Sequence, residues 1–457
     1  MEALDYARSH RDKFLAELKQ FLTIPSISTQ PEHGPDIQRA AVWLRDRLLE
    51  VGFPTAEVMA TSGHPVVYGE WMAAGPDVPT VLIYGHYDVQ PPDPLDLWDA
   101  PPFEPTLVGD DVFARGASDD KGQLYVHVKA LEAFHETTGM PPVNVKCIFE
   151  GEEESGSLSL DPFLREHKQM LAADVALVSD TGMLAEDTPS IVYGLRGLTY
   201  VEVEVVGPER DLHSGLYGGA VQNPINALCG MIAKLHDETG RIAIPGFYDN
   251  VRIPSDKERV EFSEVPFDRE RWLREAGVKT DWGEPDYTVT ERTTVRPTLD
   301  VNGIWGGYTE LGSKTVLPSK ACAKISMRLV PDQEPMRIAG LFRDYLTDIA
   351  PEAVDVTVRN QHGAEPAIVS RDSLAMNAAV AAYKEAFSKE PVLVRRGGTI
   401  PVVAAFQRIL GIETVLMGFG LPDDGVHSPN EKFHLPNFHR GIETVIRFLQ
   451  ILDRLSP

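Results

Sequence analysis

The chain has 457 residues, of which 43% are hydrophobic and 24% are charged, and its formal net charge at pH 7 is −25. This length predicts two domains, and the composition is typical of a soluble globular protein. The excess of acidic residues argues against nucleic acid and anionic membranes as partners, because both bind basic surfaces.

The amino-terminal residues 1–5 lack the layout of a signal peptide, and no apolar run is long enough to span a bilayer. We therefore expect a cytoplasmic protein. Cys147, Cys229 and Cys322 are widely spaced and odd in number, which argues against a disulfide framework. We expect these cysteines to be buried free thiols.

The first part of the chain predicts an α/β domain. Helical periodicity extends over 4–22 and over 37–51. Strands and helices then alternate, with strands expected at 81–84, 143–149 and 175–178 and helices at 122–135 and 161–171. Such alternation predicts a mostly parallel or mixed sheet with helices on both faces.

The pattern changes after Arg196. Residues 199–206 alternate apolar and polar side chains, as expected of a strand with one face in water. They are followed by a predicted helix at 223–236, a proline- and charge-rich stretch at 244–297, a strand at 321–329 and a helix at 336–349. We interpret residues 196–368 as an inserted two-layer α+β domain.

From about Ser370 the strand–helix alternation returns. Helices are expected at 373–387, 402–410 and 441–455, and strands at 392–394 and 414–417. We therefore expect residues 1–195 and 369–457 to form one discontinuous α/β domain.

Polar clusters follow the predicted strands. His86 and Asp88 end the first strand, three glutamates including Glu153 and Glu154 follow the second, and Asp180 follows the third. Each cluster alone has a simpler interpretation, as a surface histidine, a solvated acidic loop or a turn-forming aspartate.

Two further residues extend the set of polar candidates. Asp119 precedes the helix at 122–135 and could equally cap it, and His427 could be an ordinary loop histidine. Their placement together is the stronger argument, because strand ends of one sheet converge on one edge. Histidine and carboxylate donors suit Zn²⁺, Mn²⁺ or Co²⁺ better than Ca²⁺ or Mg²⁺. The many carboxylates favour two ions about 3.5–4 Å apart, which activate a bound water near neutral pH.

Five strings span nearly the whole chain: YGHYDVQP at 84–91, RGASDDKG at 115–122, EGEEESGS at 150–157, DLHSG at 211–215 and HSPNE at 427–431. With these strings the chain resembles the co-catalytic metallopeptidases that include aminoacylase, carboxypeptidase G and the carnosinases. Within them it is most similar to the carnosinase and cytosolic nonspecific dipeptidase group.

The resemblance implies a role for each metal-site residue. Asp119 would bridge two ions, Zn²⁺ or Mn²⁺ with Co²⁺ as an alternative. His86 and Asp180 would bind one ion, and Glu154 and His427 the other. Glu153 would be the general base, and Asp88 would orient His86. The spacing itself does not decide among the three glutamates, and only the family's Glu-Glu-Ser-Gly string assigns these roles to Glu153 and Glu154.

The resemblance also implies that the inserted domain is a lid and homodimerisation domain. His213 would reach the partner subunit's active site and stabilise the oxyanion, and Arg328 would bind the substrate's C-terminal carboxylate. Thr315, His362 and Thr399 would contact substrate, and at Thr399 many relatives carry serine. Without the resemblance, all five are ordinary polar residues of loops and strands.

Taken together, the motifs favour a dinuclear-metal hydrolase. It would cleave the peptide bond of dipeptides by attack of a metal-bridging water, with Glu153 as general base. An N-acyl amino acid deacylase needs the same metal centre and stays as the alternative. A catalytically inactive scaffold is disfavoured, because all five ligand candidates and the base are present.

Overall fold

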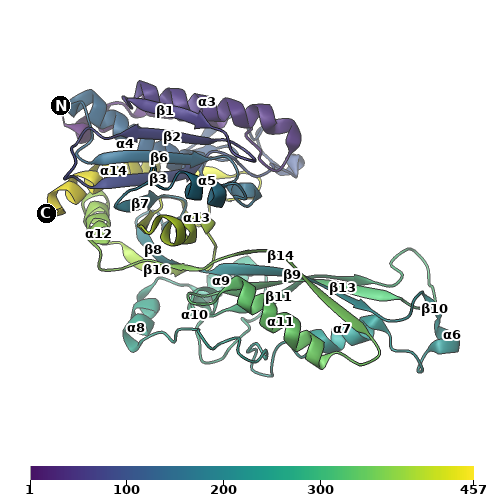
Figure 1. Ribbon diagram of the computed structural model, residues 1–457. Coiled ribbons are helices and arrows are strands. Elements are labelled where there is room, and N and C mark those ends of the chain that lie inside the picture. Colours follow the sequence, from purple (N-terminus) through teal and green to yellow (C-terminus); the bar gives the residue numbers. More distant parts are fainter. Residues whose placement is uncertain (1, 457) are drawn as a thin grey trace. The chain divides into compact units, whose positions relative to one another are not determined.

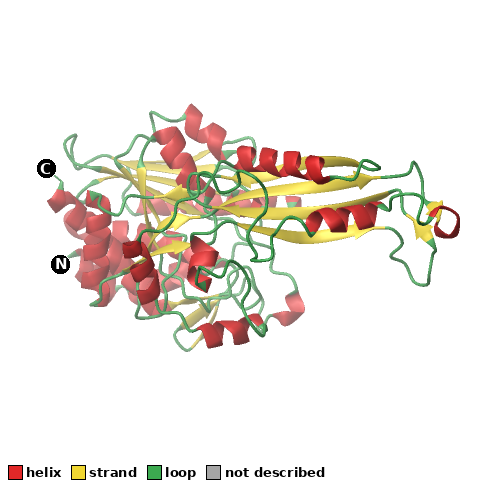
Figure 2. Ribbon diagram, turned by 90° about the horizontal axis from the view of Figure 1, so that it is seen from below, coloured by secondary structure: helices red, strands yellow, loops and turns green. Residues whose placement is uncertain are grey.

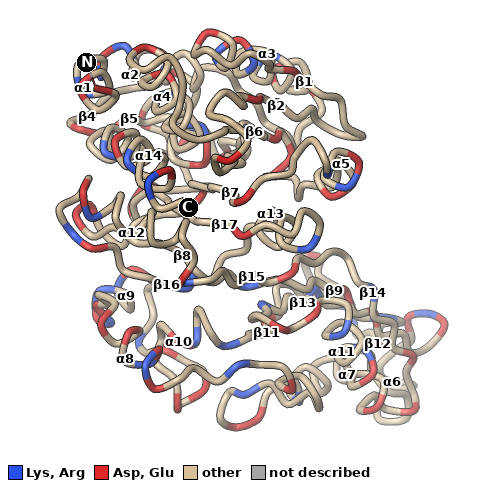
Figure 3. Tube along the Cα trace, turned by 60° about the vertical axis from the view of Figure 1, so that its left-hand side comes forward, with Lys and Arg blue, Asp and Glu red and all other residues tan. Residues whose placement is uncertain are grey.

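The computed structural model describes residues 2–456, which divide into two compact units. The first unit comprises the residues up to Tyr193, Val369–Val394 and the residues from Val402 onward. The second comprises Gly194–Ile368 and Arg395–Pro401. Acidic and basic residues are spread along the trace of both units (Figure 3). In the described part of the chain, no helix is both long and apolar enough to cross a membrane.

A mixed sheet forms the centre of the first unit, with the strand order β1-β2-β6-β3-β7-β17-β8. Strands β6, β3, β7 and β17 are parallel to one another, whereas β2 and β8 run antiparallel to their neighbours β6 and β17. The strands are β1 Thr55–Met59, β2 Val66–Trp71, β3 Thr80–His86, β6 Asn144–Glu150, β7 Val175–Val178, β8 Ser190–Leu195 and β17 Glu413–Met417. All residues of β3, β6 and β7 are buried, as expected of central strands covered on both faces, and most of their residues are apolar.

Helices cover both faces of this sheet (Figure 1). The ring of Tyr84 in β3 contacts Phe406 in η4, whereas a side chain at the next residue, Gly85, would meet Leu124 in α4. Since successive strand residues point to opposite faces, η4 and α4 lie on opposite sides. The predicted α/β fold with a mostly parallel sheet is thereby confirmed.

The helical elements of this part are α1 Ala3–Ser9, α2 Arg11–Leu22, η1 Pro31–His33, α3 Gly34–Glu50, η2 Leu95–Leu97, α4 Lys121–Thr138, η3 Glu153–Ser155, α5 Leu160–Glu166, α12 Leu374–Phe387, α13 Pro401–Ala405, η4 Phe406–Leu410 and α14 Leu435–Leu455. Short strands β4 Thr106–Val108, β5 Asp111–Phe113 and β18 Lys432–His434 form a separate sheet. Strands β15 Ala367–Ile368 and β16 Val392–Arg396 both pair with β8.

Some of the expected helix boundaries in this part were wrong. The helix expected over 4–22 is two helices that meet at His10. There the side chains of Ser9 and His10 contact the carbonyl of Tyr6, so polar side chains compete for the carbonyls that a continuous helix would use. The helix expected at 402–410 is α-helical only to Ala405 and continues as the π-helical turn η4.

The second unit is a four-stranded antiparallel sheet in the order β11-β13-β9-β14, with α7 and α11 packed against it (Figures 1 and 2). Its strands are β9 Gly197–Val206, β11 Thr298–Gly306, β13 Lys320–Leu329 and β14 Asp355–Ala364. Val203, Ile325 and Phe342 belong to one buried cluster between the sheet and the helices. The opposite face carries the polar residues of the alternating pattern, so the predicted α+β insertion is confirmed.

The remaining elements of the second unit are β10 Leu212–His213, α6 Ser214–Tyr217, α7 Pro224–Ile232, α8 Asp256–Glu264, α9 Arg269–Ala276, α10 Val289–Thr294, β12 Val316–Leu317 and α11 Pro335–Ile349. The proline- and charge-rich stretch contains α8, α9 and α10, and its polar residues Ser255, Asp268 and Thr288 cap these helices. The expectation of three buried thiols was wrong for Cys229, which lies exposed on α7.

Candidate metal centre

The candidate ligands gather where the parallel strands end. His86 is the last residue of β3, Glu154 lies in η3 directly after β6, and Asp180 follows β7. Asp119 precedes α4, and His427 lies in the loop after β17. Because β6, β3, β7 and β17 are parallel neighbours, their carboxyl ends meet at one edge of the sheet.

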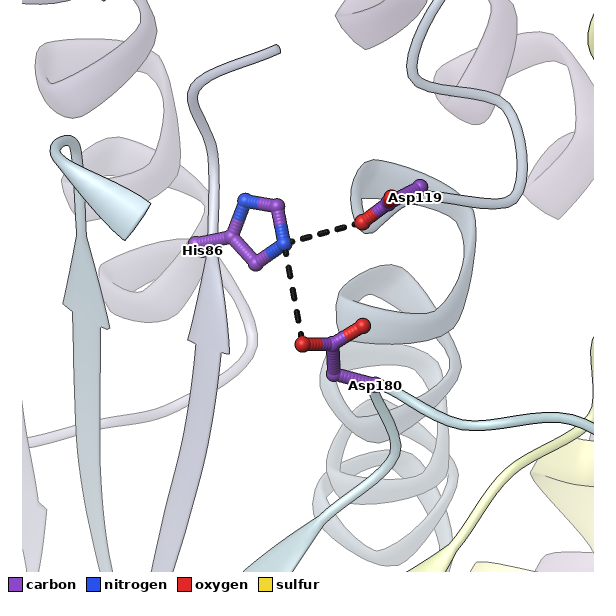
Figure 4. A group of neighbouring side chains, drawn as sticks. All are labelled: His86, Asp119 and Asp180. Carbon is purple, nitrogen blue, oxygen red and sulfur yellow. Dashed lines mark hydrogen bonds and ion pairs between the residues drawn. The ribbon is translucent and has the colours of Figure 1, made fainter. Parts of the chain in front are cut away.

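Asp119 stands at the middle of this group. Its Oδ1 lies 3.0 Å from Nε2 of His86, and its Oδ2 lies 3.0 Å from Nε2 of His427. Asp180 Oδ2 is 3.9 Å from the same His86 nitrogen, as Figure 4 shows. Glu154 Oε2 is 3.2 Å from the His427 nitrogen. Two three-residue ligand groups therefore share one carboxylate, and each group offers its atoms within 4.8 Å of one another.

The electrostatics of this group suit bound cations. Burial raises the pKa of Asp180 to about 7, and the charges of Asp119 and Glu154 add to the increase. Burial also raises the pKa of Glu153 well above its usual value, with a further contribution from Asp180. Glu154 Oε1 is buried and has no hydrogen-bond partner among the described residues. Cations would neutralise this repulsion, and the mixed nitrogen and oxygen donors fit two divalent ions such as Zn²⁺ or Mn²⁺.

Asp88 is fully buried beneath these ligands. Nδ1 of His86 lies 3.1 Å from the backbone carbonyl of Asp88 and 3.4 Å from its Oδ1, so both groups of Asp88 face the ring of the candidate ligand. The same carboxylate accepts hydrogen bonds from the backbone N–H of Glu153 at 3.2 Å and of Glu154 at 3.0 Å. Asp88 therefore fixes η3 as well as the ring of His86.

Three further residues contact the ligands, and sequence reasoning did not single them out. Gln90 Nε2 donates to Glu154 Oε2 at 2.7 Å, and Asp120 Oδ2 accepts from the backbone N–H of His86 at 3.2 Å. Glu431 accepts from the backbone N–H of Asp119 at 3.1 Å. All three lie inside the motif strings at 84–91, 115–122 and 427–431, so proximity to the motifs was the available signal.

Three of the predicted substrate residues lie at one end of the second unit's sheet. Arg328 on β13 is opposite Leu198, and His362 on β14 is opposite Tyr200, so both flank β9. Arg328 Nη1 donates to Thr399 Oγ1 at 3.1 Å. The ring of His362 stacks on Tyr200, with 5.0 Å between the ring centroids.

Arg196 adds a second guanidinium that the sequence did not reveal as a site residue. Thr399 Oγ1 donates to the backbone carbonyl of Arg196 at 2.6 Å. Burial, together with the nearby charge of Arg328, lowers the pKa of Arg196 to about 10. Within the described residues Arg196 Nη1 is buried and has no hydrogen-bond partner. Two repelling cations beside a hydroxyl make this part of the unit suitable for an anion.

His213 and Thr315 lie elsewhere in the same unit. His213 pairs with Val316 in the β10–β12 ladder, and Thr315 accepts from the backbone N–H of Ser214 at 3.1 Å. This ladder lies beyond the Lys320 end of β13 (Figure 1). The eight residue-to-residue steps from Lys320 to Arg328 span about 26 Å at about 3.3 Å per step, so the two groups do not meet within one copy of this unit.

The side chain of His213 is exposed and has one defined contact. Its Nδ1 accepts a hydrogen bond from the backbone N–H of Gly215 at 2.9 Å. Because Nδ1 accepts, the neutral ring carries its proton on Nε2 and presents an N–H donor there.

Comparison with known proteins agrees with this geometry. The family model described as Peptidase family M20/M25/M40 matches residues 82–451. The chain is 33% identical to Cys-Gly metallodipeptidase dug1 of Schizosaccharomyces pombe, over 98% of this chain and 97% of the relative. It is 31% identical to human Beta-Ala-His dipeptidase, over 99% of this chain and 93% of that protein.

Solved structures give the same result. The M20 family metallo-carboxypeptidase Sso-CP2 from Sulfolobus solfataricus superposes with a TM-score of 0.87 at 33% identity, covering 96% of this chain and 99% of that chain. Human carnosine dipeptidase 1 superposes with a TM-score of 0.83 at 30% identity, covering 99% of this chain and 98% of that chain. The resemblance that the motifs carried is thereby confirmed, and the chain belongs to the metallopeptidases of peptidase family M20/M25/M40.

Proposed function

We propose that this protein is a dipeptidase that uses two divalent metal ions. The observation that carries the proposal is the placement of Asp119, whose two oxygens each lie 3.0 Å from a different histidine. A carboxylate in that position is suited to bridge two ions. His86 and Asp180 would hold one ion, and Glu154 and His427 the other.

Two bound ions would polarise the scissile carbonyl and lower the pKa of a water between them. Glu153 takes a proton from the attacking water and later passes it to the leaving amine. Asp88 positions the residues of this step, because it accepts a hydrogen bond from the backbone N–H of Glu153 and its carboxylate faces His86. Arg328 binds the free carboxylate of the substrate through its guanidinium group, and Thr315, His362 and Thr399 contact the substrate.

We further propose that two subunits complete each site. The long separation between His213 and Arg328 within one unit favours His213 acting on a partner subunit's substrate, where its Nε2–H stabilises the oxyanion. Apolar side chains near the β10–β12 ladder are strongly exposed, with Leu216 at 76% and Leu311 at 99%. Exposed apolar groups of this kind are typical of an interface, here a homodimer through the inserted domain.

The substrate class follows from the relatives and the anion-binding residues. The relatives are named for Cys-Gly and Beta-Ala-His dipeptides, and both kinds carry a free carboxylate. We propose unblocked dipeptides for this chain. The alternative, an N-acyl amino acid deacylase, uses the same metal centre and also presents a free carboxylate. A panel of dipeptides and N-acetyl amino acids, assayed with Zn²⁺-, Mn²⁺- and Co²⁺-loaded protein, separates the two activities.

The decisive variant is Glu153→Gln. We expect turnover to fall about 10²- to 10⁴-fold while both ions stay bound, because a proton acceptor is lost and no ligand is removed. Glu152→Gln is the matched control, since Glu152 accepts from the backbone N–H of Ser159 at 3.1 Å and should change turnover little. Release of no amino acid from the whole panel by metal-loaded wild-type protein would refute the proposed function.

Co-expression of two inactive variants tests the contribution of the partner. In a mixed dimer of Glu153→Gln and His213→Ala, one site combines an intact Glu153 with the intact His213 of the other subunit. Random pairing should therefore restore about a quarter of the wild-type activity if His213 acts in trans. No restored activity in a verified mixed dimer would show that His213 acts within its own subunit or not at all.

A further inference from the structure

We propose that Glu431 is a positioning residue of the metal centre, which holds the backbone of the Asp119 loop so that both oxygens of Asp119 face their histidines. The inference rests on the proposed metal centre and adds a residue to it. Among the described residues, Glu431 contacts the segment 115–119 rather than either candidate histidine. Its effect passes through the segment 115–119.

The contacts of Glu431 converge on one short segment. Its side chain is fully buried. Oε1 accepts from the backbone N–H of Ser118 at 2.9 Å and of Asp119 at 3.1 Å. Oε2 accepts from the backbone N–H of Gly116 at 2.9 Å and from Nη1 of Arg115 at 2.8 Å. Four donors on one carboxylate use its whole accepting capacity, and all four come from residues 115–119.

A second carboxylate, that of Asp424, also joins the loop that carries His427 to the segment 115–119. Asp424 Oδ2 accepts from Ser118 Oγ at 2.7 Å and from the backbone N–H of Leu421 at 2.7 Å. His427 lies between Asp424 and Glu431 in the chain, with φ at 60°. The loop that carries His427 is therefore joined at both of its ends to the segment that carries Asp119.

This arrangement resembles the one made by Asp88, which holds the backbone of Glu153 and Glu154. Asp88 accepts hydrogen bonds from the backbone of the loop after β6, and Glu431 accepts them from the backbone of the loop before α4. Ligand geometry must hold within about 0.5 Å for tight binding, so backbone anchors of this kind control affinity. A shift of Asp119 would affect both ligand groups, because its carboxylate belongs to both.

The variant Glu431→Gln separates this role from simple stability. Its amide keeps one acceptor oxygen but points an NH₂ group at two of the four donors. We expect the affinity for both ions to fall about 10- to 100-fold, the range seen when supporting partners of ligands are removed. His427→Ala is expected to weaken one ion much more than the other. Binding is measured by calorimetric titration of chelator-treated protein with Zn²⁺ alone.

Glu443→Gln is the matched control. Glu443 is a carboxylate on α14 with 8% exposure, and it pairs with Arg8 at 2.6 Å rather than with the segment 115–119. This variant should bind both ions as the wild type does. The unfolding of each variant in chelator is recorded as well, so that affinities are compared only among folded proteins.

Wild-type Zn²⁺ affinity at both sites in folded Glu431→Gln would overturn the proposed positioning and leave the metal centre intact. If Glu431→Gln does not fold, Glu431→Asp and Asp424→Asn are titrated instead, and unchanged affinity in both would overturn the inference. Wild-type protein that bound no Zn²⁺, Mn²⁺ or Co²⁺ would overturn the metal centre and the inference together. Weakened binding of both ions in a folded Glu431 variant supports the positioning role of Glu431.

Discussion

Removal of the Asp88 side chain tests how the metal centre is built. In Asp88→Ala, the backbone N–H groups of Glu153 and Glu154 lose their acceptor, which lies 3.2 and 3.0 Å away. An unsatisfied buried donor costs about 1–3 kcal/mol, and because these two donors are only partly buried, the free energy of unfolding should fall by about 1–3 kcal/mol in total. The loss of the carboxylate behind His86 should also lower metal affinity about 10- to 100-fold.

Two measurements keep these effects apart. Urea unfolding in the presence of a chelator reports the free energy of unfolding without metal. Calorimetric titration with Zn²⁺ reports the affinity of the folded protein. Asp88→Asn keeps one acceptor oxygen and should lose about half as much stability as Asp88→Ala.

Asp174→Ala is the control for the Asp88 variants. Its carboxylate accepts from the backbone N–H of Thr80 at 2.7 Å, at the opposite end of β3 from His86. Asp174 is exposed, so its replacement should change stability by less than about 1 kcal/mol and leave Zn²⁺ affinity unchanged. A loss below about 1 kcal/mol in Asp88→Ala, together with wild-type affinity, would refute the anchoring role of Asp88.

Three other outcomes are expected. Zn²⁺ at 100 times its dissociation constant should stabilise the protein by about 2.7 kcal/mol for each ion bound, and Asp119→Ala should abolish most of that chelator-sensitive shift in a melting assay. Burial lowers the pKa of His127 from 6.5 to about 3, so the unfolded state binds the extra proton and stability falls as the pH drops below 6.5. His127→Gln should reduce this slope by up to about 1.4 kcal/mol per pH unit in urea unfolding between pH 7 and pH 4, and an unchanged slope would contradict it. Phe342→Ala, in the buried cluster of the second unit, should lower the free energy of unfolding by about 3–5 kcal/mol without changing Zn²⁺ affinity, and a loss under about 1 kcal/mol would contradict the packing.

The central strands could be predicted because burial on both faces makes most of their residues apolar. The strand expected at 175–178 coincides with β7, and those at 81–84 and 143–149 lie within one or two residues of β3 and β6. Strand β14 was missed, because most of its residues are exposed and its apolar alternation is limited to Val356 and Val358. Its backbone pairs with β9, which local sequence does not encode.

The candidate ligands could be proposed for a related reason. Polar residues that directly follow buried strands, such as His86 and Asp180, must lie near one sheet edge once the strands are parallel neighbours. Glu431, which acts through backbone contacts, gave no such signal. Glu431 is a loop glutamate in the sequence, and its contact with Asp119 joins residues 312 positions apart.

The sequence by itself determined the two-part organisation, the residue types of the metal centre and the resemblance to a peptidase family. Motif composition and buried-strand patterns are local properties of the chain, so they can be recognised from the sequence alone. Only the tertiary structure decided which oxygen of Asp119 faces which histidine, that Asp88 also holds η3, and that His213 lies far from Arg328 in its own unit. These facts depend on strand register and on contacts between segments hundreds of residues apart, which no local pattern specifies.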